Sequence, residues 1–212
     1  MSQANNGNRL VAAELAAALG ECQIGKELHV VEETSSTNDL AWQAETRGAP
    51  EGFVVFAERQ TAGRGRYGRR WESAPSQGLW FSVLLHPPLT LKESPHLTSL
   101  LAKTIATTIT DQFGCIVWIK MPNDIYFGSR KIAGILVEGR NGNNGNYVAV
   151  AGLGVNLNQA ISDFPDELRE TAGSLRIATG RHVERAQFAA ALLRKLEENY
   201  RDAYAGVVGR NR

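Results

Sequence analysis

Apolar residues recur every three or four positions in two long segments of the chain, the spacing that gathers them on one face of a helix. The first segment starts at Ser94 and Pro95 and ends at Gly114, and its apolar face comprises Leu97, Leu100, Leu101, Ile105 and Ile109. The second runs from Arg185 to about Tyr204, and its apolar face comprises Phe188, Leu192, Leu193, Leu196 and Tyr200. The pattern predicts two long amphipathic helices.

Two shorter helices are expected nearer the amino terminus. Residues 10–19 are rich in alanine and leucine and are followed by Gly20, a residue type that commonly ends a helix. In the stretch ETSSTNDLAWQAETRG, Ser36 or Thr37 can cap a helix that continues to Gly48. These segments complete the helical part of the prediction.

Short apolar runs bounded by turn-forming residues predict strands at residues 27–31, 53–58, 79–85, 115–119, 125–127, 131–138 and 147–157. Most of these strands follow one another without a helix between them, which favours antiparallel pairing. We therefore expect an α+β fold, with a mixed, largely antiparallel sheet packed against a few helices. The chain of 212 residues has no internal repeat or long linker, so we expect a single domain, residues 1–212, with residues 1–8 as a disordered tail.

The charge balance and the hydrophobic content of the chain exclude several classes of protein. Lysine and arginine number 23 against 22 acidic residues, so the chain is not globally basic, and 43% of its residues are hydrophobic. No apolar run approaches the roughly 20 residues that cross a bilayer, and the first residues lack the apolar core of a signal peptide. We expect a cytoplasmic protein that does not bind membranes.

Cysteine and histidine usage gives no sign of a metal site. Cys22 and Cys115 lie far apart and are expected to be reduced and buried. The histidines have no ligand spacing and are expected to be structural or on the surface; they are His29, His86, His96 and His182.

The stretch QTAGRGRYGRRW, residues 60–71, concentrates positive charge on little side-chain bulk. It carries three glycines and four arginines within residues 63–70. Glycine disfavours both helix and strand, so a loop is predicted between two strands. Glycine also lets the backbone approach a ligand closely, and arginine presents a planar, charged fork that matches carboxylate and phosphate oxygens. The stretch predicts an anion-binding loop.

Two further stretches are candidates for chemistry. In WIKMPNDIYFGSRKIAGILVE, Asp124 could be only a turn residue and Lys131 only a solvated charge, but the strand that follows Lys131 is apolar, so this lysine can point into a cleft. In AGLGVNLN, residues 151–158, Gly152 and Gly154 remove side chains from one face of a strand. Either a ligand lies against that face or the strand contains a β-bulge.

Taken together, these stretches resemble those of biotin protein ligases. The strings SSTND, QTAGRGRYGRRW, KMPNDIY, RKIAGILVE and GLGVNLN occur in the order and spacing of that family, and the resemblance spans about residues 32–200. It implies a fold like that of biotin ligases and class II aminoacyl-tRNA synthetases. It also implies a reaction in which biotin and ATP form biotinyl-5′-AMP, from which biotin passes to a lysine of a carrier protein.

The resemblance also implies roles for individual residues. Catalytic roles fall to Lys131, Arg66 and Asp124. Biotin is expected to contact Ser36, Thr37, Asn38, Gln60, Arg64, Gly65, Arg66 and Lys131. The nucleotide is expected to contact Arg64, Arg66, Arg69, Trp71, Asn123, Lys131, Gly152, Gly154 and Asn156, although Trp71, like Trp80, could instead serve packing.

The resemblance implies cofactors and partners as well. Magnesium is expected to arrive with ATP and not through a side-chain motif, and no tightly bound prosthetic group is expected. The expected partner is the biotin carboxyl carrier domain of acetyl-CoA carboxylase or a related carboxylase. Family members can pair through sheet edges, which leaves a homodimer open.

Three departures from the family pattern affect these expectations. Met121 stands where the family string K-W-P-N-D has tryptophan, which we expect to alter packing and not chemistry. Too few residues precede Glu27 for a helix-turn-helix domain, so no DNA binding is expected. The chain ends soon after its last predicted helix, without the small β-barrel-like domain of many relatives, which bears on nucleotide affinity.

Two alternative functions stay open at this point. A lipoate or octanoate ligase would share the fold and the acceptor chemistry. A nucleic-acid-binding module could use GRGRYGRR as an arginine-glycine tract with Tyr67 stacked on a base, although the near-neutral net charge disfavours it. A P-loop enzyme is disfavoured because the string G-x-x-x-x-G-K-[ST] is absent.

Overall fold

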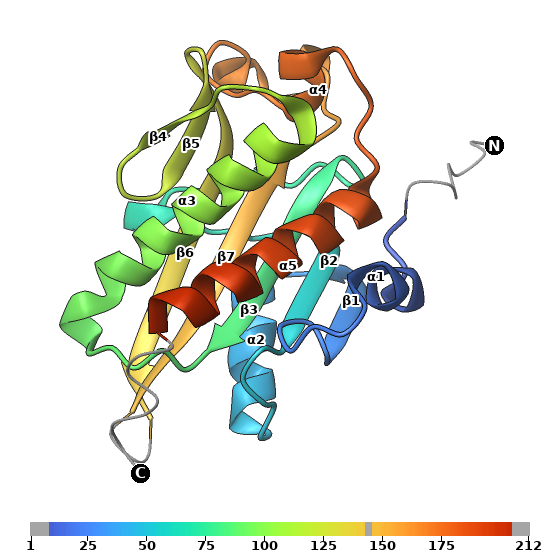
Figure 1. Cartoon of the computed structure of the whole chain (residues 1–212). Helices are drawn as coiled ribbons and strands as arrows, with labels where there is room; N and C mark the ends of the chain where they lie inside the picture. Colours follow the sequence, from blue (N-terminus) through green and yellow to red (C-terminus); the bar gives the residue numbers. More distant parts are fainter. Residues whose placement is uncertain (1–8, 143–145, 205–212) are drawn as a thin grey trace.

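A seven-stranded sheet forms the centre of the molecule (Figure 1). The computed structural model describes residues 9–142 and 146–204, so the predicted tail at residues 1–8 lies outside the described residues. Across the sheet the strands follow the order β1-β2-β3-β7-β6-β5-β4. Their bounds are β1 Leu28–Thr34, β2 Val54–Gln60, β3 Gly78–Leu85, β4 Trp118–Lys120, β5 Asp124–Phe127, β6 Arg130–Asn141 and β7 Tyr147–Asn156.

The pairing of the strands is mixed and largely antiparallel, as predicted. Strands β1 and β2 are parallel, and each of the other neighbouring pairs is antiparallel. Helix α2 (Thr37–Thr46) connects the parallel pair, because parallel strands need a crossover and cannot be joined by a hairpin. The predicted strand at residues 115–119 is shorter than expected, since β4 begins only at Trp118.

Three of the other helices were also expected from the sequence. They are α1 (Ala12–Leu19), α3 (Ser94–Phe113) and α5 (Arg185–Tyr204). Gly20 and Gly114 follow α1 and α3 with φ of 71° and 66°, positive values that glycine adopts without strain. The short helix α4 (Leu175–Thr179) was not predicted, because five residues are too few to show a helical period.

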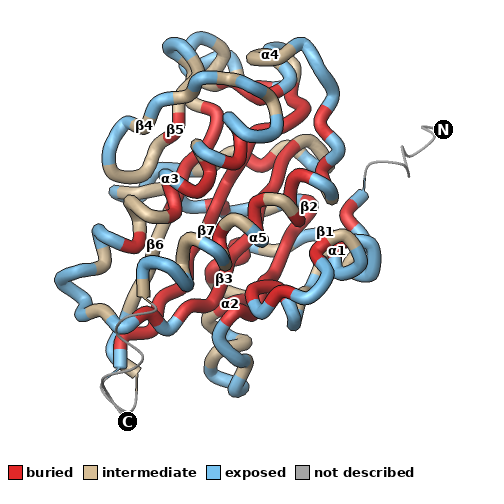
Figure 2. Tube along the Cα trace, in the orientation of Figure 1, coloured by how far each residue is buried: buried red, intermediate tan, exposed pale blue. Residues whose placement is uncertain are grey.

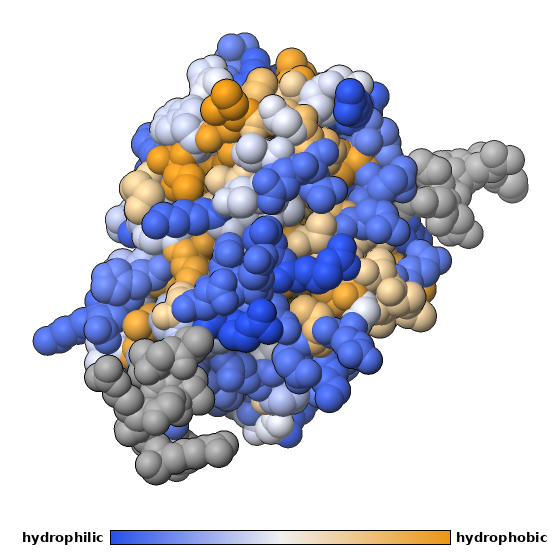
Figure 3. Space-filling model, viewed as in Figure 1, coloured by the Kyte–Doolittle hydropathy of each residue, from blue (hydrophilic) through white to orange (hydrophobic). Residues whose placement is uncertain are grey.

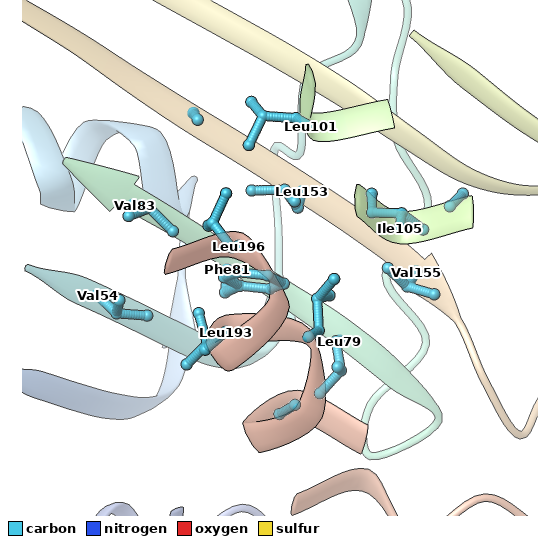
Figure 4. Close-up of a cluster of buried hydrophobic side chains, with 14 of the residues drawn as sticks. Val54, Leu79, Phe81, Val83, Leu101, Ile105, Leu153, Val155, Leu193 and Leu196 are labelled. Carbon is cyan, nitrogen blue, oxygen red and sulfur yellow. The ribbon is translucent and has the colours of Figure 1, made fainter. Parts of the chain in front are cut away.

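One face of the sheet is covered by α1, α3 and α5 (Figures 1 and 2). Alternate residues of β3, among them Leu79, Phe81 and Val83, point into this interface, as do Leu153 and Val155 of β7 (Figure 4). The helices contribute Leu101, Ile105, Leu193 and Leu196 to the same cluster (Figure 4). The two amphipathic patterns in the sequence therefore mark the helices that build the main core.

The opposite face of the sheet carries α2 and the basic loop. Ala41 of α2 packs on Val55, Leu84 and Val150, which are the strand positions that alternate with those of the main core. This smaller apolar cluster covers only part of the face. The remainder is where Trp71, Gly152 and the start of α2 surround cavities.

The surface seen in Figure 3 is hydrophilic over the outward side of α5, as expected for an amphipathic helix. Among the described residues, no helix is both long enough and apolar enough to cross a membrane.

A buried ion pair joins the start of α5 to β2. Arg185 lies 2.9 Å from a carboxylate oxygen of Glu58, and the two side chains are 1% and 3% exposed. Arg185 also donates to the Gly78 carbonyl, and Glu58 accepts from the Leu10 amide and the Ser76 hydroxyl. The pair fixes α5 against the end of the sheet that carries the basic loop.

Of the two free thiols, only that of Cys22 is buried as predicted. Cys115 is half-buried, because it follows the end of α3 at the rim of the sheet and not within it.

Candidate active site

Two adjoining cavities lie on the face of the sheet that carries α2. The narrow one has a volume of about 50 Å³ and the larger one about 320 Å³. Six residues line both: Gly65, Arg66, Trp71, Asn123, Asp124 and Lys131. The cavities therefore meet at the basic loop and at the hairpin formed by β5 and β6.

The first turn of α2 forms one end of the narrow cavity. The amide and hydroxyl of Thr37 donate to the side-chain oxygen of Gln60, at 2.8 and 3.2 Å. Ser36 occupies the N-cap position, but its hydroxyl makes no capping hydrogen bond, contrary to one form of our prediction. Because Ser36 is buried and lines the cavity, its hydroxyl is placed for a ligand instead.

Asn38 is held in a defined orientation deeper in the same cavity. Its Nδ2 donates to Glu138 at 3.1 Å, and its Oδ1 accepts from Ser82 Oγ at 2.6 Å. A Cβ at position 152 would lie 2.3 Å from Asn38 Oδ1. Gly152 is therefore required by the close approach of Asn38 to the sheet.

Gly154 has the same kind of role beneath Trp71. A Cβ there would lie 2.5 Å from the indole ring. The pairing of β7 with β3 and with β6 runs through Gly152 and Gly154 without a shift of register, so the β-bulge alternative is wrong. The glycines create room for Asn38 and Trp71, which in turn line the cavity.

The basic loop is a pinned hairpin and not an open loop. The Gly65 amide donates to the Arg69 carbonyl at 2.7 Å, and the Trp71 amide donates to the Gly63 carbonyl at 2.9 Å. At its tip Tyr67 has φ of 59°, which is unusual for a residue other than glycine, and its side chain is 84% exposed. These bonds hold the arginine side chains beside the cavities.

Arg64 is neutralised by two carboxylates. Its guanidinium makes two bonds to Asp39, at 2.9 and 2.7 Å, and one to Glu138 at 3.3 Å. The hydrogen bond from Arg64 lowers the pKa of Asp39, and the reciprocal bond from Asp39 raises the pKa of Arg64. Arg64 thus fastens the basic loop to α2 and β6 and lines the narrow cavity only.

Arg66, in contrast, is held by uncharged groups. One nitrogen donates to Asn123 Oδ1 at 2.9 Å and the other to the Tyr67 hydroxyl at 3.1 Å. Its carbon centre also lies 5.0 Å from the centre of the Tyr67 ring. The positive charge of Arg66 therefore remains available for an anion at the junction of the cavities.

Lys131 lies at the same junction, at the start of β6. Its Nζ is 2.7 Å from Asp124 Oδ1 and 5.2 Å from the centre of the Trp71 ring. Asp124 also accepts from Asn123 Nδ2 at 2.8 Å. As the sequence suggested, this lysine points along the sheet into a cleft.

The larger cavity is bounded by the basic loop, β5 and the segment of residues 164–173. Arg69 lines it, and no ion-pair partner of Arg69 is found within the described ranges. Burial and the nearby charge of Asp124 raise the pKa of Tyr126 in its wall. Asn156 also lines the cavity, but its Nδ2 is already bonded to the Gly173 carbonyl at 2.9 Å.

Every site residue predicted from the sequence lines one cavity or the other. Those that line the narrow cavity alone are Ser36, Thr37, Asn38, Gln60, Arg64, Gly152 and Gly154, and those that line the larger cavity alone are Arg69 and Asn156. The histidines line neither. In the part of the chain that is described, no group of three or more metal-ligating side chains could hold a metal ion.

Several contributors were not predicted. Asp39, Glu138 and Ser82 orient the predicted residues, and Phe164, Leu168, Thr171 and Ala172 form a cavity wall. Single acidic and hydroxyl residues carry no sequence pattern that separates these roles from solvent exposure. Met121, which was expected to alter packing and not chemistry, is 60% exposed in the turn that leads into β5.

Known proteins resemble this chain over much of its length. The model of the biotin/lipoate A/B protein ligase family matches residues 30–156, more than half of the chain. The bifunctional ligase/repressor BirA of Bacillus subtilis is 37% identical over 194 residues, covering 92% of this chain and 60% of that protein. The biotin--[acetyl-CoA-carboxylase] ligase of Mycobacterium tuberculosis is 33% identical, covering 81% and 63%. The chain spans about three fifths of the length of these curated relatives.

Solved structures show the same fold. A biotin protein ligase from Aquifex aeolicus in complex with biotin and ATP superposes with a TM-score of 0.72 at 29% identity, covering 85% of this chain and 72% of that one. A biotin protein ligase from Leishmania major in complex with biotinyl-5-AMP gives 0.67 at 23% identity, covering 86% and 81%. The predicted fold class is confirmed.

Proposed function

Because this chain belongs to the biotin/lipoate A/B protein ligase family, we propose that it is an ATP-dependent biotin protein ligase. It joins biotin to ATP to form biotinyl-5′-AMP with release of pyrophosphate, and then transfers biotin to a lysine of an acceptor protein. The proposed acceptor is the biotin carboxyl carrier domain of acetyl-CoA carboxylase or a related carboxylase, since the similar Mycobacterium tuberculosis protein is a biotin--[acetyl-CoA-carboxylase] ligase.

The observation that carries this proposal is the position of Arg66 and Lys131. Both line the narrow cavity and the larger one, at the junction where two ligands would meet. A carboxylate extending from the narrow cavity and a phosphate in the larger cavity would both lie beside these cations. An acid and a nucleotide that must react with each other require such a junction.

The first step brings two anions together. The carboxylate oxygen attacks the α-phosphorus, the bond to pyrophosphate breaks, and pyrophosphate leaves with the electron pair. Fixed cations that face the developing charge lower this barrier. Arg66 is suited to the task because its partners, Asn123 and Tyr67, are uncharged.

Magnesium is part of the substrate in this proposal. Triphosphate oxygens bind Mg²⁺ together with only one or two protein carboxylates, so no dedicated cage of side chains is needed. MgATP therefore supplies much of its own charge neutralisation, and the chain adds Arg66, Arg69 and Lys131, of which Lys131 is already paired with Asp124 at 2.7 Å.

The narrow cavity suits the ureido ring of biotin. That ring presents N–H donors and a carbonyl acceptor, and the cavity presents the Ser36 hydroxyl and the amide groups of Asn38 and Gln60. The orientations of Asn38 and Gln60 are fixed by hydrogen bonds to neighbouring residues. Such fixed polar groups favour one ligand over isosteres that lack its hydrogen bonds.

Asp124 serves the second step. The acceptor amine must lose a proton as it attacks the carbonyl carbon of the mixed anhydride, after which AMP leaves. Asp124 lines both cavities, and its side chain is 19% exposed, so an incoming lysine can reach it. Asp124 is placed to orient that amine and to accept its proton.

We also propose a cellular location for the protein. We place the protein in the cytoplasm, where free thiols such as those of Cys22 and Cys115 persist.

The nucleic-acid alternative loses support from the pairing of Arg64 with Asp39 and of Arg70 with Glu72, which reduces the positive charge available for phosphates. A homodimer stays a prediction, which light scattering of the purified protein would test.

The test is direct detection of both products by mass spectrometry. The purified chain is incubated with MgATP, biotin and a carrier domain, and in parallel with a carrier domain whose acceptor lysine is replaced by arginine. We expect biotinyl-AMP in both mixtures and a biotin mass increment on the intact carrier alone. A lipoyl increment with lipoate, and none with biotin, would assign the chain to the other branch of the family.

A further inference from the structure

The segment of residues 164–173 is the least regular wall of the larger cavity. It contains only one short 3₁₀ turn, Asp166–Leu168, yet Phe164, Leu168, Thr171 and Ala172 all face the cavity. A wall with so little secondary structure must be held by contacts from elsewhere in the fold.

Arg130, at the start of β6, provides such contacts. Its Nη1 donates to the Ala172 carbonyl at 2.9 Å and to the Arg169 carbonyl. Gly173 lies directly beside it, since a Cβ at position 173 would be 2.8 Å from Arg130 Cβ. Arg130 lines neither cavity, so its role would be indirect.

The next residue connects this wall to the reaction centre. The Lys131 amide donates to the Thr171 carbonyl at 2.8 Å, and the Gly173 amide donates to the Lys131 carbonyl at 2.9 Å. These two bonds form a parallel bridge between Lys131 and Ala172. Movement of the segment therefore moves the backbone that carries Lys131.

We propose that Arg130 is a positioning residue that sets the wall of the nucleotide cavity and the backbone of Lys131 together. The proposal rests on the proposed function, since it takes the larger cavity as the ATP site. Arginine is suited to this role because one guanidinium can serve two carbonyl oxygens of the segment at once. Asn156 independently bonds the Gly173 carbonyl, so loss of Arg130 displaces the segment without releasing it.

The test compares Arg130→Met with a matched control on the same strand. Arg140→Met makes the same chemical change at the other end of β6, where Arg140 pairs with Glu45 and lies over the Trp42 ring, away from both cavities. Gly173→Ala perturbs the same contact from the other side while keeping Arg130. Arg130→Lys keeps a cation that can reach one carbonyl and should restore part of the function.

Steady-state rates of biotin-dependent pyrophosphate exchange, measured while ATP and biotin are varied in turn, provide the readout. We expect Arg130→Met and Gly173→Ala to raise the KM for ATP by about tenfold or more, the scale that displacement of a binding wall produces. The KM for biotin should rise less than the KM for ATP, because in this proposal biotin is linked to the segment only through Lys131, whereas ATP also lies against the wall itself. Arg140→Met should resemble wild type in both constants. Equal changes in the two constants, or no change for ATP, would overturn the proposal.

A second measurement separates this proposal from the proposed function. If wild type shows no biotin-dependent pyrophosphate exchange, the proposed function fails. Amide hydrogen exchange then tests the positioning role of Arg130 independently of activity. Faster exchange at the Lys131 and Gly173 amides in Arg130→Met than in Arg140→Met would support the positioning role. Equal exchange at those two amides would overturn it.

Discussion

Replacing Arg185 by methionine should destabilise the fold strongly, because it breaks a buried ion pair. The side chains of Arg185 and Glu58 are 1% and 3% exposed. Burial lowers the pKa of Arg185, while the hydrogen bond and charge of Glu58 act in the opposite direction. Arg185→Met fills much of the volume but leaves the Glu58 carboxylate buried without its counter-charge.

The expected loss follows from the cost of such an unpaired buried charge. Breaking a buried pair from one side costs about 3 to 5 kcal/mol. In a chain of this size each kcal/mol lowers Tm by roughly 2 to 4 °C, so Tm should fall by about 6 to 20 °C. Arg59→Met is the matched control, since Arg59 pairs with Glu33 on the surface, where both side chains are about half exposed. Its cost should not exceed about 1 kcal/mol.

Differential scanning calorimetry at neutral pH, with urea unfolding as a second measure, would test this prediction. The double variant Glu58→Gln/Arg185→Met should recover part of the loss, because the uncompensated charge is then gone. A loss in Arg185→Met no greater than that in Arg59→Met would refute the reasoning about the buried pair.

Four further predictions concern the site and the amino-terminal contacts. Lys131→Ala should slow biotin-dependent pyrophosphate exchange by about 10²- to 10³-fold with an unchanged circular dichroism spectrum, and near-normal exchange would remove Lys131 from the mechanism. Arg66→Ala should increase the escape of biotinyl-AMP into solution, measured by mass spectrometry of the filtrate, whereas unchanged retention would contradict a role in holding the adenylate. Burial and a hydrogen bond to Glu197 raise the pKa of the Cys22 thiol to about 12, so alkylation of Cys22 at pH 9 should be slow in the folded protein, and rapid labelling would be contrary to this. The pKa of Glu197 is lowered: burial acts to raise it, but hydrogen bonds from Cys22 and two backbone amides lower it. Glu197→Gln should therefore reduce Tm at pH 7, and this loss of Tm should shrink as the pH falls below about 4.

The helices and strands that carry strong periodic patterns were predictable from the sequence. Residues 94–113 and 185–204 form helices as expected, and their apolar faces pack against the same face of the sheet. The parallel pairing of β1 with β2 was not foreseen, since strand direction depends on the path of the crossover helix and not on the strand residues themselves.

The two arginines of the basic loop show where sequence reasoning reaches its limit. Arg64 and Arg66 have similar neighbours in the chain and were given similar roles. In the fold, Arg64 meets Asp39 and Glu138, which lie 25 and 74 residues away, while Arg66 meets Asn123. Only the tertiary arrangement shows which of the two keeps its charge for a ligand.

The roles of the glycines in β7 also could not be settled from the sequence alone. Gly152 and Gly154 could have marked a ligand or a bulge, and the unbroken register of β7 with β3 and β6 rules out the bulge. The two glycines make space for Asn38 and Trp71, whose positions depend on α2 and on the basic loop. The wall at residues 164–173 was missed for a related reason, because it has no period of its own and is placed by contacts to β6.

The central claim is that Arg66 and Lys131 lie where an acid and a nucleotide react. The most direct measurement is exchange of labelled pyrophosphate into ATP by the purified 212-residue chain with magnesium, in parallel with biotin, lipoate and no acid. The account predicts exchange with biotin alone. A folded chain that is silent with biotin, or that responds only to lipoate, would contradict it.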